Sequence, residues 1–562
     1  MMVTFEGGGA GSGPLSWGQL DIWVKMSALG QSLAMGGVRP LPDGAGVEDV
    51  ADELRYLMSR YESMRTRLVP SVDGPPLQVV HGHGEIDLEI VDVAIGDLDA
   101  GAGECGPAEV AAQVEARYLA VPFDHVDEWP VRMAAVRAGG VCRYAVLVMS
   151  HLVLDGAGAV LMMAETDART AAPVQGHPAL EQARRQALPA GVRQNAAALR
   201  HWDTHLRAIP DPRVPPSRDV RSPRHWTGVL HSTTLPAALR VAALRAGSEV
   251  AALRAGSEPA PALLAAFAVA FAQVTGVTVV PLRLVSSNRF RAGFADVVCP
   301  VSQAGLCVVD TAGDFTAVVR RTQGAALAAY KHAYYNRLDL DAVIAAVVAD
   351  RGPQFDLDVS INDRRLGGAL QDVPRPERTE FAWVGSQDEP SSALFLNVDG
   401  SDEAMAITMY IDSHFLAPAD GEALLWAMEA IAVTAAAAAD DAAATVTAAD
   451  GATATATAAD GATATVIATA ASDAPVAGDA AAGDAAAPGH AAVADDAAAA
   501  GDVAVAGDLA ADARITATSG VPATADVPAT AGVAGAGAGV AAGDVGEAAA
   551  DVEERVVAPT GS

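Results

Sequence analysis

The chain has 562 residues, which is long enough for two or three domains and a large core. Its formal net charge of −32 argues against electrostatic binding to nucleic acid or to an anionic membrane surface. The amino terminus has neither a basic start nor an apolar run, so no signal peptide is expected. Outside Ala-rich sequence no apolar run is long enough to cross a membrane. We therefore expect a cytoplasmic protein.

The cysteines predict neither a metal site nor a disulfide framework. They lack the spacing of metal ligands and are too few to staple a chain of this length. The whole sequence holds four of them: Cys105, Cys142, Cys299 and Cys307. A reducing compartment is the simplest setting for such a chain.

Residues 14–172 are predicted to form a first α/β lobe, after a flexible amino terminus of residues 1–13. Ser16 fits the amino-terminal cap of a helix, and Gln19 three residues later completes a capping box. Apolar periodicity predicts another helix near residues 108–119. Two helices are therefore expected in this part of the chain, in addition to the strands described next.

Two apolar runs, residues 131–137 and 143–149, are separated by a short segment that suits a hairpin. The second run is apolar on both faces, which is typical of an inner strand of a sheet covered on both sides. A turn at Asp155-Gly156 then leads into a predicted helix at residues 157–168.

Residues 173–224 are rich in Pro and Arg and are predicted to connect the first lobe to a second lobe, residues 225–435. A helix is predicted at residues 195–207, followed by a Pro-studded run without regular structure. The alternative is one continuous domain with a long surface loop.

Three helices are predicted in the second lobe. The first is nearly all apolar, as expected of a buried helix, and Gly276 would end it. Their approximate ranges are 260–275, 314–333 and 420–433.

The nine residues VAALRAGSE occur twice in succession, at 241–249 and 250–258. Nine residues advance a helix by about 2.5 turns, so one continuous helix would place the two copies on opposite faces. We expect Gly247-Ser248 to end one helical piece, and replication slippage to explain the second copy.

Residues 436–562 are predicted to be a disordered acidic tail. The segment consists almost wholly of Ala, Asp, Gly, Thr, Val and Pro, and it has no aromatic residue. It carries 18 acidic and two basic residues, half of the net charge. Such a composition cannot bury enough apolar surface to offset its ordering entropy. A solubilising or accidental extension is favoured over a binding function.

The strongest candidate for chemistry is the segment Ser150–Gly156, directly after the apolar run at 143–149. His151 would be held at the exit of a strand, and its near-neutral pKa suits it to accept or relay a proton. Asp155 is better suited to hold the loop, and when buried it would need a basic partner. Taken alone, a histidine at a strand end is more often structural than catalytic.

Several segments in order resemble motifs of condensation domains from nonribosomal peptide synthetases. Residues 150–156 resemble the motif His-His-x-x-x-Asp-Gly, with Ser150 in place of the first His. Residues 60–68 resemble Arg-His-Glu-x-Leu-Arg-Thr-x-Phe, and residues 16–23 resemble Ser-x-x-Gln-x-x-x-Trp. The resemblance covers residues 14–435 and includes three further segments: 122–133, Asn288-Arg289 and 297–310.

The resemblance implies two chloramphenicol-acetyltransferase-like lobes that form a V-shaped pseudo-dimer with a central tunnel. His151 would orient an amine or hydroxyl that attacks a thioester, and deprotonation of that group is a second role that the resemblance leaves open. Asp155 would pair with Arg289, and Gly156 would leave room beside the acyl group. Ser302 would line the tunnel, where the family has Asn. For Arg60, Glu62, Arg65 and Thr66 we prefer a structural role, at a helix end held by ion pairs.

The resemblance also implies the substrates and partners. No cofactor would be bound, and the substrates would arrive on the phosphopantetheine arms of acyl or peptidyl carrier proteins. Because the sequence shows no adenylation or carrier domain, the chain would act in trans, as a monomer. An arginine cluster in the connection is the candidate docking site: Arg213, Arg218, Arg221 and Arg224. The alternatives are a degenerate, non-catalytic domain that binds carrier proteins, or an acyltransferase that uses acyl-coenzyme A.

Overall fold

The computed structural model describes most of the chain up to Ala456. The ranges are 1–72, 74–93, 106–210, 214–246, 260–352, 358–367, 373–388, 392–456 and 514–516. The expected break at Gly247-Ser248, the second copy of the repeat and nearly all of the tail after Ala456 lie outside these residues.

The first lobe is built on a six-stranded sheet with the order β1-β6-β7-β8-β3-β16. Residues 1–13 were expected to be flexible, but β1 lies within them, and its Val3 and Phe5 are buried in the core. The strands of this sheet are β1 (Met2–Glu6), β6 (His83–Val93), β7 (Val131–Ala138), β8 (Val141–Met149), β3 (Met35–Pro40) and β16 (Arg514–Thr516). A three-stranded sheet comprises β2 (Gly11–Pro14), β5 (Leu77–Val80) and β4 (Thr66–Val69). The helices are α1 (Trp17–Leu29), α2 (Val47–Arg60), the 3₁₀ turn η1 (Glu62–Arg65), α3 (Pro107–Ala120) and α4 (Gly156–Asp167).

Strand β8 is an inner strand of this sheet, as its sequence predicts. It pairs antiparallel with β7, in the expected hairpin, and with β3 on its other side. Leu147 and Met149 join the core that also contains the buried face of α2. Val146 points to the opposite face, where it packs with residues of α3. Both faces of β8 are therefore covered, which explains its unbroken apolar run.

The second lobe has its own seven-stranded sheet, with the order β11-β10-β12-β14-β15-β9-β13. The strands are β11 (Gln303–Asp310), β10 (Val279–Ser286), β12 (Val359–Asp363), β14 (Leu394–Gly400), β15 (Met405–Asp412), β9 (His225–Ser232) and β13 (Glu380–Gln387). The helices are α7 (Thr234–Arg245), α9 (Ala260–Thr275), α10 (Phe315–Lys331), α11 (Arg337–Arg351), α12 (Pro418–Ala456) and the 3₁₀ turn η2 (Arg364–Gly367).

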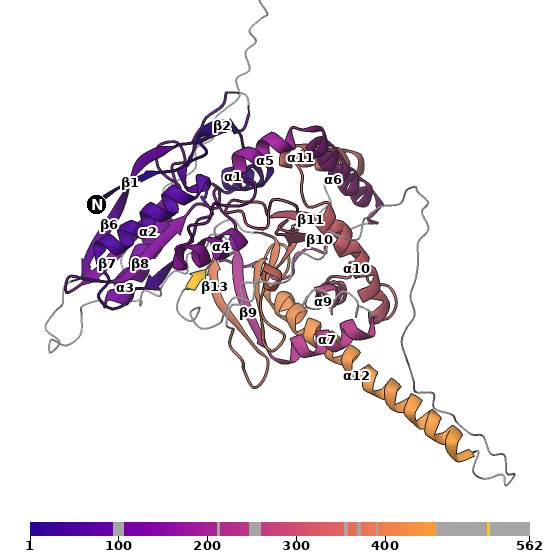
Figure 1. Ribbon diagram of the computed structural model, residues 1–562. Helices are drawn as coiled ribbons and strands as arrows, with labels where there is room; N and C mark the ends of the chain where they lie inside the picture. Colours follow the sequence, from indigo (N-terminus) through magenta and orange to yellow (C-terminus); the bar gives the residue numbers. More distant parts are fainter. Residues whose placement is uncertain are drawn as a thin grey trace, which may run out of the picture. The chain divides into compact units, whose positions relative to one another are not determined.

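Helix α9 is the central helix of the second lobe. It contacts α7, α10 and α12 (Figure 1) and belongs to a core separate from that of the first lobe. Phe267 and Phe271 are both buried and their rings stack. The helix ends where the sequence predicts, because Gly276 takes a positive φ of 78° that favours glycine.

The connection between the lobes is more structured than its composition suggests. It contains two helices, α5 (Ala179–Gln186) and α6 (Pro189–Ala208). Helix α5 contacts β2 and α1 of the first lobe, whereas α6 contacts α11 and β11 of the second. Trp202 of α6 is buried with Leu340 of α11. The segment that follows, residues 214–224, has neither helix nor strand, as its prolines predict.

Helix α12 extends past the predicted start of the acidic tail. It continues to Ala456, so the boundary placed at residue 435 falls inside a helix. Residues Pro418–Ala438 have the length and the mean hydropathy of 1.3 that a membrane span would need, alone among the helices of the described ranges. Leu424, Leu425 and Met428 nevertheless lie in the core of the second lobe. These contacts are those of a core helix.

Deleting residues 440–562 should change the melting temperature by less than about 2 °C. The reason is that the part of α12 that packs against the core ends at Ala436, and among the described residues the deletion otherwise removes only the end of α12 and the three-residue edge strand β16. Thermal denaturation followed by circular dichroism measures this. A longer deletion that begins at Leu424 is the control, because it removes buried side chains and should unfold the second lobe. A large fall in melting temperature for the shorter deletion would contradict the prediction.

Candidate active site

The segment between β8 and α4 is anchored in the core of the first lobe by buried apolar side chains. Leu152, Val153 and Leu154 are at most 1% exposed and belong to the core of the first lobe. The Ser150 N–H donates to the Pro130 carbonyl at 3.0 Å. The loop is therefore fixed at its start by the residue that precedes β7 and along its length by the core.

His151 is half-buried in this segment. Its Nδ1 lies 2.8 Å from the carbonyl oxygen of Leu154. Because a carbonyl can only accept, Nδ1 carries the proton in the neutral ring and Nε2 keeps a lone pair. Burial lowers the pKa of His151 below 6.5, with the Asp155 charge opposing this shift and Lys25 adding to it. At neutral pH the ring is therefore an uncharged base with Nε2 available.

Asp155 caps helix α4 and joins the two lobes. Its Oδ1 accepts from the Gly158 N–H at 2.9 Å and from Arg289 Nη2 at 2.7 Å. Its Oδ2 accepts from Arg289 Nη1 at 3.0 Å and from the backbone N–H groups of Val301 and Ser302, both at 3.1 Å. The resemblance implied this pairing with Arg289, and the structure brings the two side chains together.

The charge on Asp155 is stabilised by these contacts. Burial alone would raise the pKa of Asp155, but the Arg289 charge and the hydrogen bonds outweigh it and lower the pKa from 3.8 to about 2. The carboxylate is 2% exposed, and the Arg289 side chain is 14% exposed. Asp155 is therefore a bracing anion and not a proton carrier at neutral pH.

Ser302 contacts this ion pair directly, whereas Gly156 follows Asp155 in the chain and has open space beside it. The Ser302 hydroxyl donates to Asp155 Oδ2 at 2.8 Å, so it adds to the bracing contacts around the carboxylate. Gly156 is exposed, and a Cβ placed on it would meet no atom within 4 Å. Gly158, which the sequence analysis did not single out, is tighter: a Cβ there would lie 3.1 Å from both Asp155 and Arg289.

Ser150 is fully buried and hydrogen bonded on two sides. Its Oγ accepts from the Leu152 N–H at 3.2 Å and lies 2.7 Å from Nε2 of His125. His125 was not predicted as a site residue, although it lies within the segment 122–133 that resembles the family. The only signal in the sequence was the presence of a histidine in the segment that precedes the motif at residues 150–156.

The residues from 60 to 66 make structural contacts, in agreement with the preferred interpretation. Arg60 Nε donates to Glu165 Oε2 of α4 at 2.8 Å. Arg65 is 1% exposed and donates to the Gly8 carbonyl at 2.7 Å, and Thr66 Oγ1 donates to the Glu62 carbonyl at 2.9 Å. These bonds tie the end of α2 to α4 and to the amino-terminal strands.

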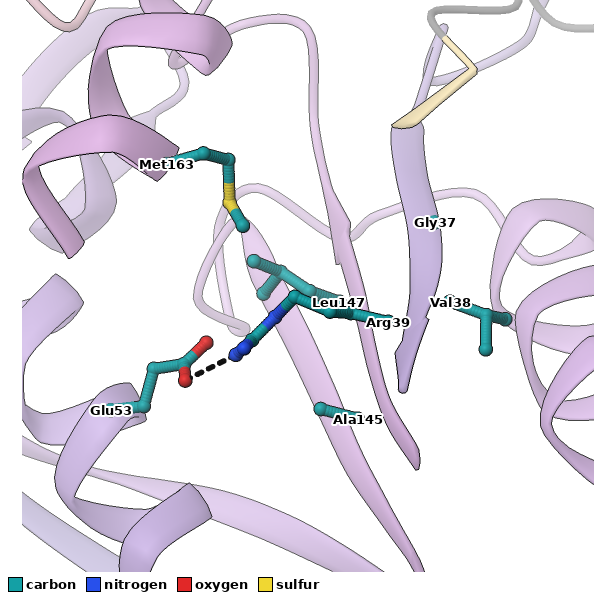
Figure 2. Close-up of a pocket in the computed structure, with 7 residues that line it drawn as sticks. All are labelled: Gly37, Val38, Arg39, Glu53, Ala145, Leu147 and Met163. Carbon is teal, nitrogen blue, oxygen red and sulfur yellow. Dashed lines mark hydrogen bonds and ion pairs between the residues drawn. The ribbon is translucent and has the colours of Figure 1, made fainter. Parts of the chain in front are cut away.

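A small cavity lies between β3 and β8 and the helices α2 and α4 (Figure 2). It has a volume of about 20 Å³, which holds about one water molecule and no acyl chain. Arg39 and Glu53 form an ion pair at its wall, beside Leu147 and Met163. This cavity contains no residue of the His151 segment and is not the candidate site.

Residues 22–416 match the family described as Condensation domain. The chain belongs to the condensation-domain family. The match includes most of both lobes, the His151 segment and Arg289. A condensation domain is an acyltransferase of the kind used by peptide and polyketide synthetases, which is the class of activity that the resemblance implied.

Solved condensation-domain structures share the fold of this chain. One is from a study of condensation-domain-mediated chain release from the enacyloxin polyketide synthase. It has a TM-score of 0.56 and 19% identity, over 75% of this chain and 82% of that one. The SgcC5 protein of Streptomyces globisporus has a TM-score of 0.53 and 17% identity, over 76% and 99%. The predicted mixed α/β, chloramphenicol-acetyltransferase-like fold is thus confirmed.

Two further relatives extend the comparison. The first condensation domain of the calcium-dependent antibiotic synthetase, solved with a substrate analogue, has a TM-score of 0.54 and 14% identity, over 76% of this chain and 96% of that one. Cyclosporin synthetase simA of Tolypocladium inflatum is 24% identical over 345 residues, which are 58% of this chain and 2% of that protein. The chain therefore spans only a small part of that synthetase.

Proposed function

We propose that this condensation domain joins an acyl or aminoacyl thioester, presented on a carrier protein, to an amine or hydroxyl acceptor. The observation that carries the proposal is the state of His151, a neutral imidazole with Nδ1–H held by the Leu154 carbonyl and Nε2 left free. The loop that presents it is braced across the two lobes by Asp155 and Arg289. A rigid base of this kind suits acyl transfer.

In the proposed reaction the acceptor nitrogen or oxygen attacks the thioester carbonyl carbon while Nε2 of His151 takes the proton from the acceptor. The carbon–sulfur bond then breaks, and the thiolate of the carrier arm leaves and receives that proton. Alignment of the two reactants supplies most of the acceleration, and the base adds to it by taking the proton. The open space beside Gly156 would admit the acyl group.

Asp155 has an indirect part in this scheme. Its carboxylate is occupied by Arg289 and by backbone donors of the second lobe, so it has no free oxygen for a substrate. It keeps the turn after His151 in place and contributes negative potential that favours the imidazolium formed during the reaction.

The test of the function is mass spectrometry of the purified protein mixed with carrier proteins from its own pathway, one loaded with an acyl thioester. Transfer of the acyl group to an amine or hydroxyl acceptor supports the proposal. Transfer from acyl-coenzyme A alone would favour the second type of acyltransferase. Carrier binding without any transfer would identify a non-catalytic domain.

The arginine cluster in the connection remains the proposed carrier site, but the structure divides its members. Arg224 is engaged with Asp412 through two hydrogen bonds, of 2.8 and 2.6 Å. Arg221 pairs with Asp219, whereas Arg218 is exposed. Arg213 lies outside the described residues. Arg218 and Arg221 are therefore the members to test, because replacing Arg224 would disturb a structural ion pair.

We expect weak, salt-sensitive binding to a phosphopantetheinylated carrier protein, with a Kd on the order of micromolar or weaker. Replacing Arg218 and Arg221 by serine should weaken binding several-fold at low salt. The reason is that the substitutions remove two positive charges that, in the proposed complex, face the acidic carrier. Calorimetry at low and high salt measures this. The matched control changes two exposed arginines of α6, Arg193→Ser and Arg200→Ser. Binding that responds neither to salt nor to the first pair would contradict this docking site.

A further inference from the structure

His125 reaches the active-site loop from another part of the first lobe. It lies between α3 and β7, where its carbonyl accepts from the Leu68 N–H of β4 at 2.7 Å. Its Nε2 lies 2.7 Å from Ser150 Oγ, directly before His151. The backbone of this segment is thus tied to a strand, while the imidazole touches the start of the catalytic loop.

The direction of the hydrogen bonds follows from the partners. The ring of His125 also bonds to the backbone of Phe123, in a contact that raises its pKa, as donation by a ring N–H does. Burial lowers the pKa of His125 below 6.5, with Glu128 and Asp124 opposing and Arg132 adding to this shift. In the neutral ring Nε2 is then the acceptor, and the Ser150 O–H donates to it.

Ser150 and Leu152 hold the backbone on both sides of His151. The Ser150 hydroxyl donates to His125 and accepts from the Leu152 N–H at 3.2 Å. A hydroxyl with its proton fixed in this way keeps a lone pair aimed at that N–H. The peptide units that flank His151 are therefore clamped by one buried hydroxyl, whose direction is set by His125.

A serine beside a histidine base is also the arrangement of an activated nucleophile. Ser150 is 0% exposed, however, and its Oγ already has two hydrogen-bond partners. A thioester carbonyl could not reach it without displacing the core of the loop. His125 and Ser150 therefore hold the loop that carries His151 and do not form a site of covalent catalysis.

We propose that His125 is a positioning residue for His151, acting through the Ser150 hydroxyl, in an inference that rests on the proposed function. The chain has Ser150 where the family motif has its first histidine, and the side chain is too short to replace an imidazole. His125 supplies an imidazole that contacts the Ser150 hydroxyl from the neighbouring segment. The two residues together orient His151 so that Nδ1 meets the Leu154 carbonyl and Nε2 stays free.

The first test needs no substrate. Selective ¹⁵N labelling of histidine, followed by NMR, reports the tautomer of the His151 ring, assigned by comparison with the His151→Ala variant. We expect a single Nδ1–H tautomer in the wild type and a mixture of tautomers in His125→Leu. His125→Gln, which keeps a polar group near the position of Nε2, should restore the single tautomer. Unchanged ring signals in His125→Leu would overturn the proposal.

The second test uses turnover. His125→Leu should lower kcat by on the order of 10- to 100-fold with little change in KM, since a misplacement of about 1 Å can cost about 10²-fold. His125→Gln should recover most of the rate. The exchange His125→Leu with Ser150→His returns an imidazole to the loop and should also recover activity. The control is Asp127→Asn, an exposed position in the same segment.

The outcomes separate the two proposals. A wild type that transfers no acyl group defeats the proposed function, while the NMR result still decides whether His125 orients His151. If His125→Leu fails to fold, Ser150→Ala carries the test. A normal kcat and a single tautomer in Ser150→Ala would overturn the positioning role.

Discussion

Replacing His151 by alanine should reduce acyl transfer by about 10²- to 10⁴-fold, the range that general-base assistance supplies. The variant loses the one neutral base that the loop presents, while the Asp155 brace stays in place. The melting temperature should change little, since the side chain is half-buried and gives up one hydrogen bond, to the Leu154 carbonyl. The assay is mass spectrometry of carrier-bound product, at a fixed concentration of loaded carrier.

The control for this variant is His83→Ala, which removes an exposed histidine of β6 and should leave the rate unchanged. The pH profile adds a second readout. Because burial lowers the pKa of His151 below 6.5, the base stays deprotonated to a lower pH than an ordinary histidine does. The rate of the wild type should therefore be level at neutral pH and fall in acid, with a midpoint below 6.5. Turnover of the alanine variant close to that of the wild type would contradict the assigned role.

Replacing Asp155 by alanine should lower the free energy of unfolding by about 3–5 kcal/mol, the usual cost of removing one partner of a buried ion pair. Arg289 would be left as a buried charge without its carboxylate, and the Gly158, Val301 and Ser302 N–H groups would lose their acceptor. Denaturant titration of the wild type and the variant measures the difference. Activity should also fall, since the loop that carries His151 loses its connection to the second lobe.

The pH dependence of stability gives an independent check on Asp155. Its folded pKa of about 2 lies below its ordinary value of 3.8, so the carboxylate contributes stability above pH 3.8. This contribution, on the order of 2 kcal/mol, is lost as pH falls from 3.8 towards 2. The variant should lack this part of the acid sensitivity. Asp92→Ala, which breaks an exposed ion pair with Arg137, is the matched control and should leave the unfolding midpoint unchanged. An equal effect of the two substitutions would contradict the bracing role of Asp155.

Local patterns in the sequence predicted several elements correctly. The capping box is present as expected, with Ser16 Oγ accepting from the Gln19 N–H at 3.3 Å and Gln19 Oε1 accepting from the Ser16 N–H at 3.0 Å. The apolar run of β8 and the nearly all-apolar helix α9 were likewise visible, since each is buried on all sides. The capping box depends on residues a few positions apart, and the apolar composition of β8 and α9 follows directly from their burial.

The range of helix α2 was not predicted, although Arg60 was expected at a helix end and the apolar signal was available. Val50, Leu54 and Leu57 recur at helical spacing and are all at most 1% exposed. The strands of the first sheet show a different limit. Their order, β1-β6-β7-β8-β3-β16, is not the order of the sequence, because the pairing of β3 with β8 crosses more than a hundred residues. No local pattern encodes which distant strand will be the neighbour.

Family motifs in the sequence pointed to His151, Asp155 and Arg289, and the alternation of strands and helices indicated the α/β class. The tertiary structure alone placed the Ser302 hydroxyl on Asp155 and the His125 imidazole on Ser150. The physical reason is the range of the interactions. Caps, turns and apolar periods act between residues a few positions apart, whereas a buried hydroxyl finds its partner among whatever side chains the packed lobes bring within about 3 Å.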